Sequence, residues 1–274
     1  MIVSAYAKIN WTLDITGTRT DGYHLMDTVM QQVSLCDTLS VESSEEISLT
    51  IDSPWPLLAD EGNLIVKALR VMQCGAKVHL QKRIPLQAGL GGGSADAAAV
   101  MLTVNKIYDL GLTIEQLCQL GVTLGADVPF CLVGGACRAQ GIGEVLSPLP
   151  AKKYPLLLIK PQIGFNTRAI FAAYDAVGGE SPNTPKFLSA YAAEDTMGMR
   201  QNAANALQRG ALLQSGCLQT AMQAACAHDA VYACLTGSGS AIYALFGNMQ
   251  TALDAQEALR GQFAFVQAVE TLGT

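Results

Sequence analysis

The sequence has few charged residues and no excess of basic ones. Only 15% of its 274 residues are charged, and 17 Lys and Arg stand against 23 Asp and Glu, which gives a formal net charge of −6. A chain without surplus basic residues has little with which to displace counterions from a phosphate backbone, so a general nucleic-acid binder is disfavoured. Half of the residues are hydrophobic, which is too many for an intrinsically disordered protein.

Long apolar runs are missing as well. No uninterrupted stretch approaches the roughly 18 apolar residues that a membrane-spanning helix needs. The N-terminal MIVSAYAKIN lacks the basic and then apolar layout of a signal peptide. We therefore expect a soluble protein of the cytoplasm. A chain of this length is near the size at which one core divides into two, and Pro148, Pro150 and Pro155 place the expected domain boundary near residue 150.

Clusters of metal ligands are absent from the sequence. The eight cysteines contain no C-x-x-C pair, and His24, His79 and His228 are scattered, so no zinc site is predicted. Most cysteines lie inside apolar stretches, such as Cys131 in VPFCLVGG. Because a chain of this size does not need disulfide bonds to be stable, we expect reduced cysteines that behave as small buried hydrophobes.

The first fifteen residues alternate between apolar and polar side chains, which is the period of a β-strand with one buried face. Lys8 and Asn10 would then stand side by side on the polar face. The segment TGTRTDGYH that follows is predicted to be a loop from its Gly, Thr and Asp content. The apolar positions of the strand are Val3, Ala5, Ala7, Ile9, Trp11, Leu13 and Ile15.

The rest of the chain mixes strand and helix patterns, and the second half is typical of an α+β fold with an antiparallel sheet. Further strands are expected at 28–35, 38–42, 47–51, 77–84, 154–160, 230–235, 241–246 and 263–269. Helices are expected at 63–74, 94–108, 113–124, 167–177, 200–214, 217–227 and 251–261.

The most informative stretch is a glycine-rich loop, PLQAGLGGGSADAAA, at 85–99. Its four clustered glycines let the backbone approach a ligand closely and adopt positive φ. Ser94 is a suitable helix N-cap, and the alanines behind it start a helix. A glycine-rich turn before a helix presents free N–H groups and the positive end of the helix dipole to a phosphate. The alternative is a flexible turn before an ordinary capped helix, but so dense a cluster favours phosphate binding.

Three common motifs do not fit this loop. A P-loop needs a lysine after its last glycine, and none follows Gly93. The dinucleotide fingerprint G-x-G-x-x-G would need glycine where Ser94 or Asp96 stands. The hydrolase elbow G-x-S-x-G is also missing. The loop is therefore predicted to bind phosphate in a different kind of protein.

The loop resembles the P-x-x-x-G-L-G-G-G-S motif of the GHMP kinases, named for galactokinase, homoserine, mevalonate and phosphomevalonate kinases. The stretch LTGSGSAIYALF at 235–246 is similar to their C-terminal glycine motif. AYAKINWTLDITGTRTDGYH at 5–24 and LGADVPF at 124–130 resemble one family of that superfamily, the 4-diphosphocytidyl-2-C-methyl-D-erythritol kinases of the non-mevalonate isoprenoid pathway. The matching blocks span nearly the whole chain in the right order.

The resemblance implies an α+β fold of two domains with the active site in the cleft between them. Residues 1–150 would form a nucleotide-binding domain of the ribosomal S5 domain 2-like type, and residues 151–274 a ferredoxin-like domain. The enzyme would use ATP and Mg²⁺ to phosphorylate the 2-hydroxyl of 4-diphosphocytidyl-2-C-methyl-D-erythritol. A monomer or a weak homodimer is expected, without nucleic-acid or membrane partners.

Two residues acquire catalytic roles only through the resemblance. Taken alone, Lys8 is a solvent-facing lysine and Asp127 a helix cap. In the family pattern they form a catalytic pair, in which Asp127 accepts or orients the proton of the substrate hydroxyl and Lys8 stabilises charge on the moving phosphoryl group. Phosphoryl transfer depends mainly on positioning and charge stabilisation, so two such residues and a metal are sufficient.

The same resemblance implies a substrate pocket. Tyr23 would stack on a cytosine ring and His24 would hydrogen-bond to its edge, although His24 alone fits a surface histidine equally well. Asn10 matches a pocket position, and the shorter run NTRAIF matches two more. The turn at 237–239 is by itself a hairpin, and in the family it helps to close the site. The remaining expected substrate-binding residues are Thr167, Phe171, Gly237, Ser238 and Gly239.

The nucleotide side is implied in the same way. Asn63 and Leu64 match the adenine-side segment of the family, and the competing interpretation is a helix N-cap and a core leucine. Ser94 is the expected protein contact near Mg²⁺, which prefers water and phosphate oxygens as its other ligands. The family often carries Asn at the place of Asp96, whose carboxylate we expect to point away from the triphosphate. The phosphate-binding residues would be Pro85, Leu86, Gln87, Ala88, Gly89, Leu90, Gly91, Gly92, Gly93, Ser94 and Ala95.

Three other functions are compatible with parts of the pattern. A GHMP kinase for a hydroxylated acid or sugar would be indifferent to the cytidine group. A nucleotide-binding regulatory protein would keep the fold without the chemistry, but the presence of both Lys8 and Asp127 argues against it. A polynucleotide-binding module of ribosomal type would need a basic surface that this composition lacks.

Overall fold

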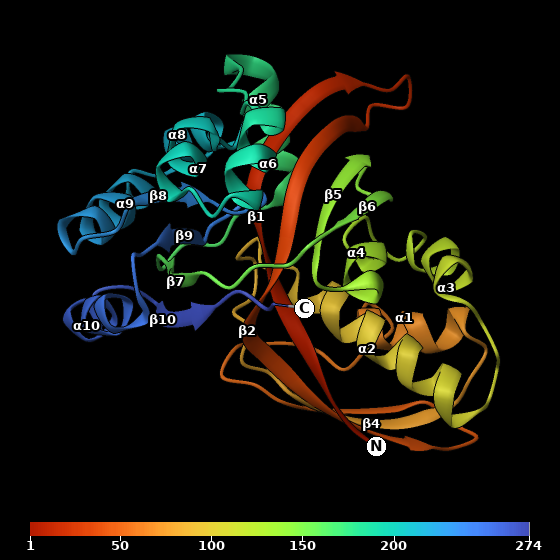
Figure 1. The fold of residues 1–274 in the computed structure, drawn as a ribbon. Coiled ribbons are helices and arrows are strands. Elements are labelled where there is room, and N and C mark those ends of the chain that lie inside the picture. Colours follow the sequence, from red (N-terminus) through yellow and green to blue (C-terminus); the bar gives the residue numbers. More distant parts are fainter. Residues whose placement is uncertain (274) are drawn as a thin grey trace.

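A long antiparallel hairpin organises the structure, a computed structural model that describes residues 1–273. Its strands are β1 (Ile2–Thr18) and β2 (His24–Ser43), paired from Ile2 with Ser40 to Thr18 with His24. The register shifts at three places along β1, including the interval between Tyr6 and Lys8. In Figure 1 the hairpin runs through the middle of the molecule and separates the two groups of helices.

The other edge of β2 is shared by two strands. Its C-terminal part pairs with β4 (Ala76–Gln81), and its N-terminal part pairs with β5 (Ala136–Gly141), both antiparallel. β3 (Ser48–Asp52) and β6 (Val145–Leu149) complete this six-stranded sheet, with β3 parallel to β4. Between β4 and β5, which pair with different parts of β2, the chain leaves the sheet and forms helices.

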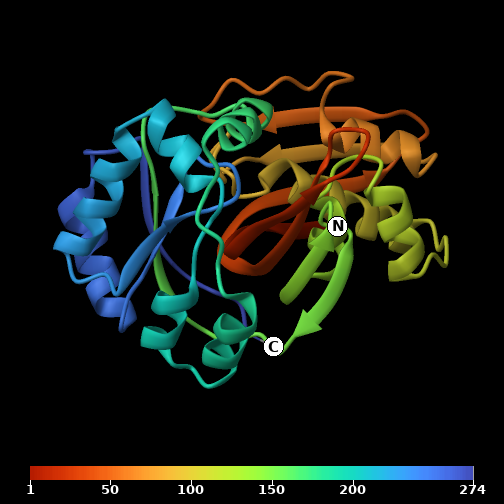
Figure 2. The same ribbon diagram turned by 90° about the horizontal axis from the view of Figure 1, so that it is seen from above.

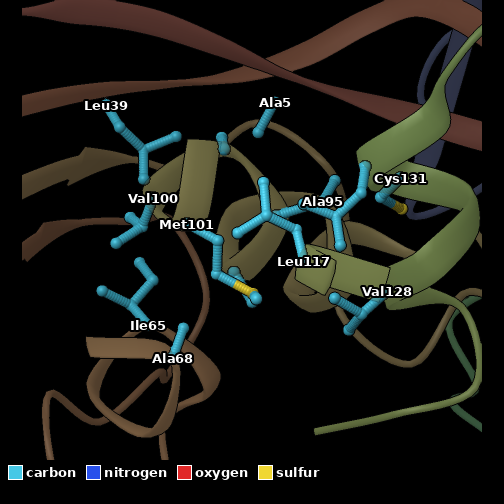
Figure 3. Close-up of a cluster of buried hydrophobic side chains, with 14 of the residues drawn as sticks. Ala5, Leu39, Ile65, Ala68, Ala95, Val100, Met101, Leu117, Val128 and Cys131 are labelled. Carbon is cyan, nitrogen blue, oxygen red and sulfur yellow. The ribbon is translucent and has the colours of Figure 1, made fainter. Parts of the chain in front are cut away.

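Four helices, one between β3 and β4 and three between β4 and β5, pack together against the first sheet. They are α1 (Leu64–Val71), α2 (Gly92–Ile107), α3 (Ile114–Gly121) and α4 (Val128–Val133). The alanines of α2 allow close packing, and all of its residues from Ala95 to Met101 are buried. Figure 3 shows Val100 and Met101 of α2 among Leu39, Ile65 and Leu117 in this core.

A second, four-stranded sheet follows in the order β10-β7-β9-β8, all antiparallel. Its strands are β7 (Pro155–Lys160), β8 (Tyr232–Leu235), β9 (Ile242–Leu245) and β10 (Phe265–Glu270). Its helices are α5 (Thr167–Val177), α6 (Thr184–Ala192), α7 (Thr196–Asn202), α8 (Gln208–Gln214), α9 (Cys217–Ala227) and α10 (Met249–Leu259). Figure 2 shows this half beside the first, with α9 and α10 outside the strands.

The two sheets share a core around Trp11 of β1. Its indole is fully buried among Tyr154, Phe187, Tyr191 and Tyr243, with ring centroids 5.3–6.5 Å away. The indole N–H donates to Gln31 Oε1 at 2.9 Å, so the polar atom of this large side chain is satisfied inside the core.

Most predicted elements are confirmed, with several corrections. The helices at 167–177 and 217–227 have the predicted bounds, whereas the strands predicted at 28–35 and 38–42 form the single strand β2. The helix predicted at 200–214 is two helices, α7 and α8, and the sequence patterns missed α4, α6, β5 and β6. No helix within residues 1–273 is long and apolar enough to cross a membrane.

The prediction of a single buried face for the first strand is wrong. Ala7, Ile9 and Trp11 are buried as expected, but Lys8 and Asn10 on the other face are each only 3% exposed. The polar face of β1 lies under the glycine-rich loop, because the Lys8 N–H donates to Leu90 O at 3.0 Å. Lys8 is therefore not a surface lysine.

Candidate active site

Most of the predicted site residues line one cavity of about 410 Å³. The first half of the chain contributes Lys8, Asn10 and Asp127 together with the loop at 85–94, and the second half contributes the turn at 237–239. Thr167 and Phe171 of α5 line the same cavity. The cavity therefore lies between the two halves and combines residues that are far apart in the sequence.

The glycine-rich loop directs its carbonyl groups into the protein. Gln87 O and Ala88 O accept the N–H groups of Ser240 and Ala241, and Gly91 O accepts that of Ala95. The first turn of α2 leaves the N–H groups at 92–94 without acceptors inside the helix. With the carbonyls occupied and these N–H groups free, the loop has the polarity that an anion requires.

The helix α2 begins earlier than expected. Its N-cap is Gly91, at φ +69°, and Ser94 lies inside the first turn, so the prediction that Ser94 is the N-cap is wrong. A Cβ atom at Gly91 would lie 3.0 Å from Lys8 Cγ and 3.1 Å from Lys8 Cε. Only glycine combines the left-handed backbone with this close approach to the lysine stem.

The turn at 237–239 lies against the glycine-rich loop. A Cβ atom at Gly237 would be 2.9 Å from Gly89 O and 3.3 Å from Lys8 Nζ, and one at Gly89 would be 2.9 Å from Gly239 N. Ser238 Oγ is 3.0 Å from Thr167 Oγ1, which ties the turn to α5. The two glycine segments thus approach one another to backbone contact at the cavity.

Lys8 and Asp127 face one another at the cavity. Lys8 Nζ lies 3.5 Å from Asp127 Oδ2, and the carboxylate is 39% exposed whereas the lysine side chain is only 3% exposed. Asp127 occupies the N-cap position of α4, but its side chain makes no capping hydrogen bond. The carboxylate therefore lines the cavity and does not cap the helix end.

A chain of hydrogen bonds fixes the Lys8 ammonium group. Lys8 Nζ donates to Asn10 Oδ1 at 2.7 Å, and Asn10 Nδ2 donates to Thr28 Oγ1 at 2.8 Å. The Asn10 backbone N–H donates to Thr236 Oγ1 at 3.0 Å, just before the turn at 237–239. Thr28 therefore sets the orientation of the Asn10 amide, and the amide in turn positions the Lys8 ammonium group. Sequence reasoning missed Thr28.

Asp96 is buried and does not itself line the cavity, although its partner Lys82 does. Its Oδ2 accepts a hydrogen bond from Lys82 Nζ at 2.7 Å, and Lys82 also pairs with Asp37. Burial raises the pKa of the Asp96 carboxyl to about 7, with Lys82 opposing the shift and Asp37 adding to it. The sequence carried a signal for this cluster, because Asp37 lies at an inward position of β2 and Lys82, which directly follows β4, continues the alternation of that strand.

The histidine predicted to bind a base lies beside the cavity rather than in its lining. His24 Nε2 is 2.7 Å from Asp175 Oδ1, and the His24 ring lies 4.9 Å from that of Phe171, which does line the cavity. Tyr23 is 61% exposed. An aromatic group with a polar edge therefore borders the α5 side of the cavity, and Asp175 is a member that the sequence patterns missed.

Three of the expected nucleotide contacts do not line the cavity. Asn63 is the N-cap of α1, and its side chain accepts the N–H of Ile65 at 3.0 Å. Leu64 packs on the first core and lies near the glycine-rich loop, 3.3 Å from a Cβ atom placed on Gly93. Ala95 is buried in the same core.

The oxygen groups at the cavity are compatible with Mg²⁺ bound mainly by phosphate and water. Ser94 supplies a hydroxyl and Asp127 a carboxylate, both of which are hard oxygen donors. Within residues 1–273 no group of three or more His, Cys, Asp and Glu side chains is placed to hold a metal ion. Any Mg²⁺ ion here would therefore depend on the substrate for most of its ligands.

Comparisons with known proteins identify the family of this chain. Residues 63–135, which contain the glycine-rich loop and Asp127, match the family model described as the GHMP kinases N terminal domain. The 4-diphosphocytidyl-2-C-methyl-D-erythritol kinase of Caldicellulosiruptor saccharolyticus is 38% identical over 95% of this chain and 93% of its own length. The chain belongs to the 4-diphosphocytidyl-2-C-methyl-D-erythritol kinase family.

Solved structures agree with the family assignment. A crystal structure of a 4-(cytidine 5'-diphospho)-2C-methyl-D-erythritol kinase covers all of both chains at 32% identity and a TM-score of 0.84. An L. major mevalonate kinase in complex with R-mevalonate has a TM-score of 0.73 at 14% identity and covers all of this chain and 96% of its own, which shows a shared fold. The α+β GHMP kinase fold predicted from the sequence is confirmed.

Proposed function

We propose that this member of the 4-diphosphocytidyl-2-C-methyl-D-erythritol kinase family transfers the γ-phosphoryl group of ATP to the 2-hydroxyl of 4-diphosphocytidyl-2-C-methyl-D-erythritol. The observation that carries the proposal is the pair of Lys8 and Asp127, 3.5 Å apart in the cavity that the glycine-rich loop also lines. A base or orienting group, a fixed cation and free N–H groups are the parts that phosphoryl transfer needs.

In this reaction the substrate oxygen attacks the γ-phosphorus atom, the bond from that atom to the bridging oxygen breaks, and ADP leaves. Asp127 accepts or orients the proton of the hydroxyl group. Lys8, held by Asn10 and Thr28, stabilises the negative charge on the transferred group. The N–H groups at 92–94 hold the phosphates of the nucleotide.

Mg²⁺ would neutralise phosphate charge beside Ser94 when it is bound. The cytidine end of the substrate would bind beside Phe171, His24 and Tyr23, where the aromatic border of the cavity offers stacking faces. Asn63 and Leu64 would act on the adenine side only indirectly, through the position of α1 next to Gly93.

The proposal divides the chain near residue 150, because β6 ends at Leu149 and β7 begins at Pro155. A functional monomer or weak homodimer is proposed, since the cavity of a single chain already contains Lys8, Asp127 and the glycine-rich loop. Activity per molecule that is constant across a dilution series would agree with this, and a loss of activity on dilution would contradict it.

The test is a coupled assay of ATP consumption with the cytidine-linked substrate, for the wild type and for Asp127→Asn. The wild type is expected to be active, and the variant to lose about 10²-fold or more of kcat because the amide cannot accept a proton. An active wild type with an undiminished variant would refute the role of Asp127. Equal turnover of a hydroxylated acid or sugar without cytidine would favour a different GHMP kinase activity.

A further inference from the structure

A buried cluster of three ionisable residues lies beside the glycine-rich loop, and one of its members, Lys82, also lines the cavity. Lys82 Nζ contacts the carboxylates of Asp37 and Asp96, and the three side chains are 1%, 0% and 4% exposed. Burying ionisable groups is costly unless their hydrogen bonds and ion pairs are well formed, so such a cluster calls for a physical explanation.

The cluster connects the two ends of the loop. Asp37 Oδ1 accepts the backbone N–H groups of Arg83 and Ile84, at 2.5 and 2.8 Å, immediately before the loop begins at Pro85. Lys82 links the same carboxylate to Asp96, one turn into α2, where the loop has ended. Both ends of the loop are thus tied to a single residue of β2.

The loop also rests directly on this cluster. A Cβ atom at Gly92 would lie 2.9 Å from Lys82 Nζ and 3.0 Å from Ile84 Cγ2. Gly92 therefore lies directly against the clamp, and its N–H is one of those left free by the helix. A displacement of Lys82 or Asp96 would change the position of this N–H group.

We propose that Asp37, Lys82 and Asp96 are positioning residues that fix the phosphate-binding N–H groups of the glycine-rich loop, through a clamp that joins β2, the end of β4 and the first turns of α2. This inference rests on the proposed function, because it takes the loop to be the site of the triphosphate. The clamp acts on the phosphate end of the nucleotide and leaves the cytidine-linked substrate untouched.

The sharpest test compares Asp96→Ala with Asp96→Asn. Alanine removes the hydrogen bond to Lys82 but leaves Lys82 paired with Asp37, and alanine favours the helix, so the variant is expected to fold. Asparagine keeps an oxygen acceptor for Lys82. Both substitutions remove the same carboxyl group, so a difference between them cannot come from the loss of a carboxylate charge. Asp254→Ala, on the exposed face of α10, is the matched control.

Binding of inorganic tripolyphosphate with Mg²⁺, measured by calorimetry, is the first readout. Asp96→Ala is expected to weaken it about tenfold or more, since a small misplacement of binding groups has large effects. Asp96→Asn and Asp254→Ala are expected to stay within about threefold of the wild type. In the kinase assay, Asp96→Ala should raise KM for ATP and leave KM for the cytidine-linked substrate unchanged.

Amide hydrogen exchange at residues 90–94, measured without ligand, is a readout that does not depend on activity. The exchange should be faster in Asp96→Ala than in Asp96→Asn. Tripolyphosphate binding at wild-type strength in Asp96→Ala would overturn the inference. An equal rise of KM for both substrates would also overturn it, because that result indicates general damage. A wild type that binds tripolyphosphate but does not phosphorylate the cytidine-linked substrate would refute the proposed function alone.

Discussion

Lys8 of β1 and Asp127 at the start of α4 approach one another to 3.5 Å although they belong to different layers of the first half. The lysine is buried and held by Asn10, whereas the carboxylate is partly open to the cavity. One partner is thus fixed and the other is accessible, as expected for a stabilising cation beside a group that exchanges protons with a substrate.

The first prediction concerns this cation. Lys8→Met should reduce kcat about 10²-fold or more, because it removes a fixed positive charge from a water-poor site. The change is measured in the coupled ATP assay. Lys67→Met, on the exposed side of α1, is the control and should leave kcat unchanged. Full turnover by Lys8→Met would remove Lys8 from the mechanism.

The second prediction concerns the aromatic border of the cavity. His24→Ala should raise KM for the cytidine-linked substrate about tenfold or more, because it removes a ring that contacts Phe171 and a hydrogen-bonding edge. KM for ATP should not change, since the glycine-rich loop is intact. His79→Ala, at an exposed position of β4, is the control. If KM for ATP rose instead, His24 would belong to the nucleotide side.

The third prediction separates backbone strain from contact between the glycine segments. Gly89→Ala introduces a Cβ atom at φ +73° that would clash with Thr236 O and lie 2.9 Å from Gly239 N, so we expect a loss of stability of about 1–3 kcal/mol or more and a strong loss of turnover. Gly111→Ala has a similar φ of +66° but open space around it. It should lose about 1 kcal/mol and keep its turnover.

Thermal unfolding and kcat/KM for both glycine variants give the comparison. Equal losses of turnover in Gly89→Ala and Gly111→Ala would mean that the contact between the glycine-rich loop and the turn at 237–239 does not contribute to turnover.

The fourth prediction concerns thiol reactivity. Burial raises the pKa of the Cys137 thiol to about 11 and that of the Cys234 thiol to about 12, so less reactive thiolate forms at pH 8 than in an ordinary thiol. Cys217 and Cys226 are exposed. Alkylation of the native protein at pH 8, followed by mass mapping, should modify these two first and spare Cys137 and Cys234 until denaturant is added. Early labelling of Cys234 would contradict the buried core.

Local patterns predicted the fold well where a residue's neighbours in the chain also determine its environment. The alternation of β1 and the periodicity of α5 and α9 are of this kind. The environment of Lys8 is not, because the loop that covers it comes from Leu90 and its neighbours. The interruption between α7 and α8 also has a distant cause, since Ala204 and Ala206 form backbone hydrogen bonds with Leu13 of β1.

The residues of the candidate site also divide into those that the local sequence reveals and those that it does not. The glycine-rich loop is visible in the sequence because its function needs an unusual local composition. Thr28 and Asp175 act through single hydrogen bonds to Asn10 and His24, and nothing in their local sequence marks them. Lys82 is intermediate, because it continues the inward alternation of β4, and a charge at such a buried position already requires a partner.

The burial of Trp11 has a consequence for how the molecule unfolds. This side chain belongs to the first strand, yet its ring contacts are Tyr154, Phe187, Tyr191 and Tyr243 of the second half. Neither half can lose its structure without exposing the indole or the rings around it, so the halves are expected to melt together in one cooperative transition. The cavity therefore lies between two units that have separate sheets but are expected to unfold together.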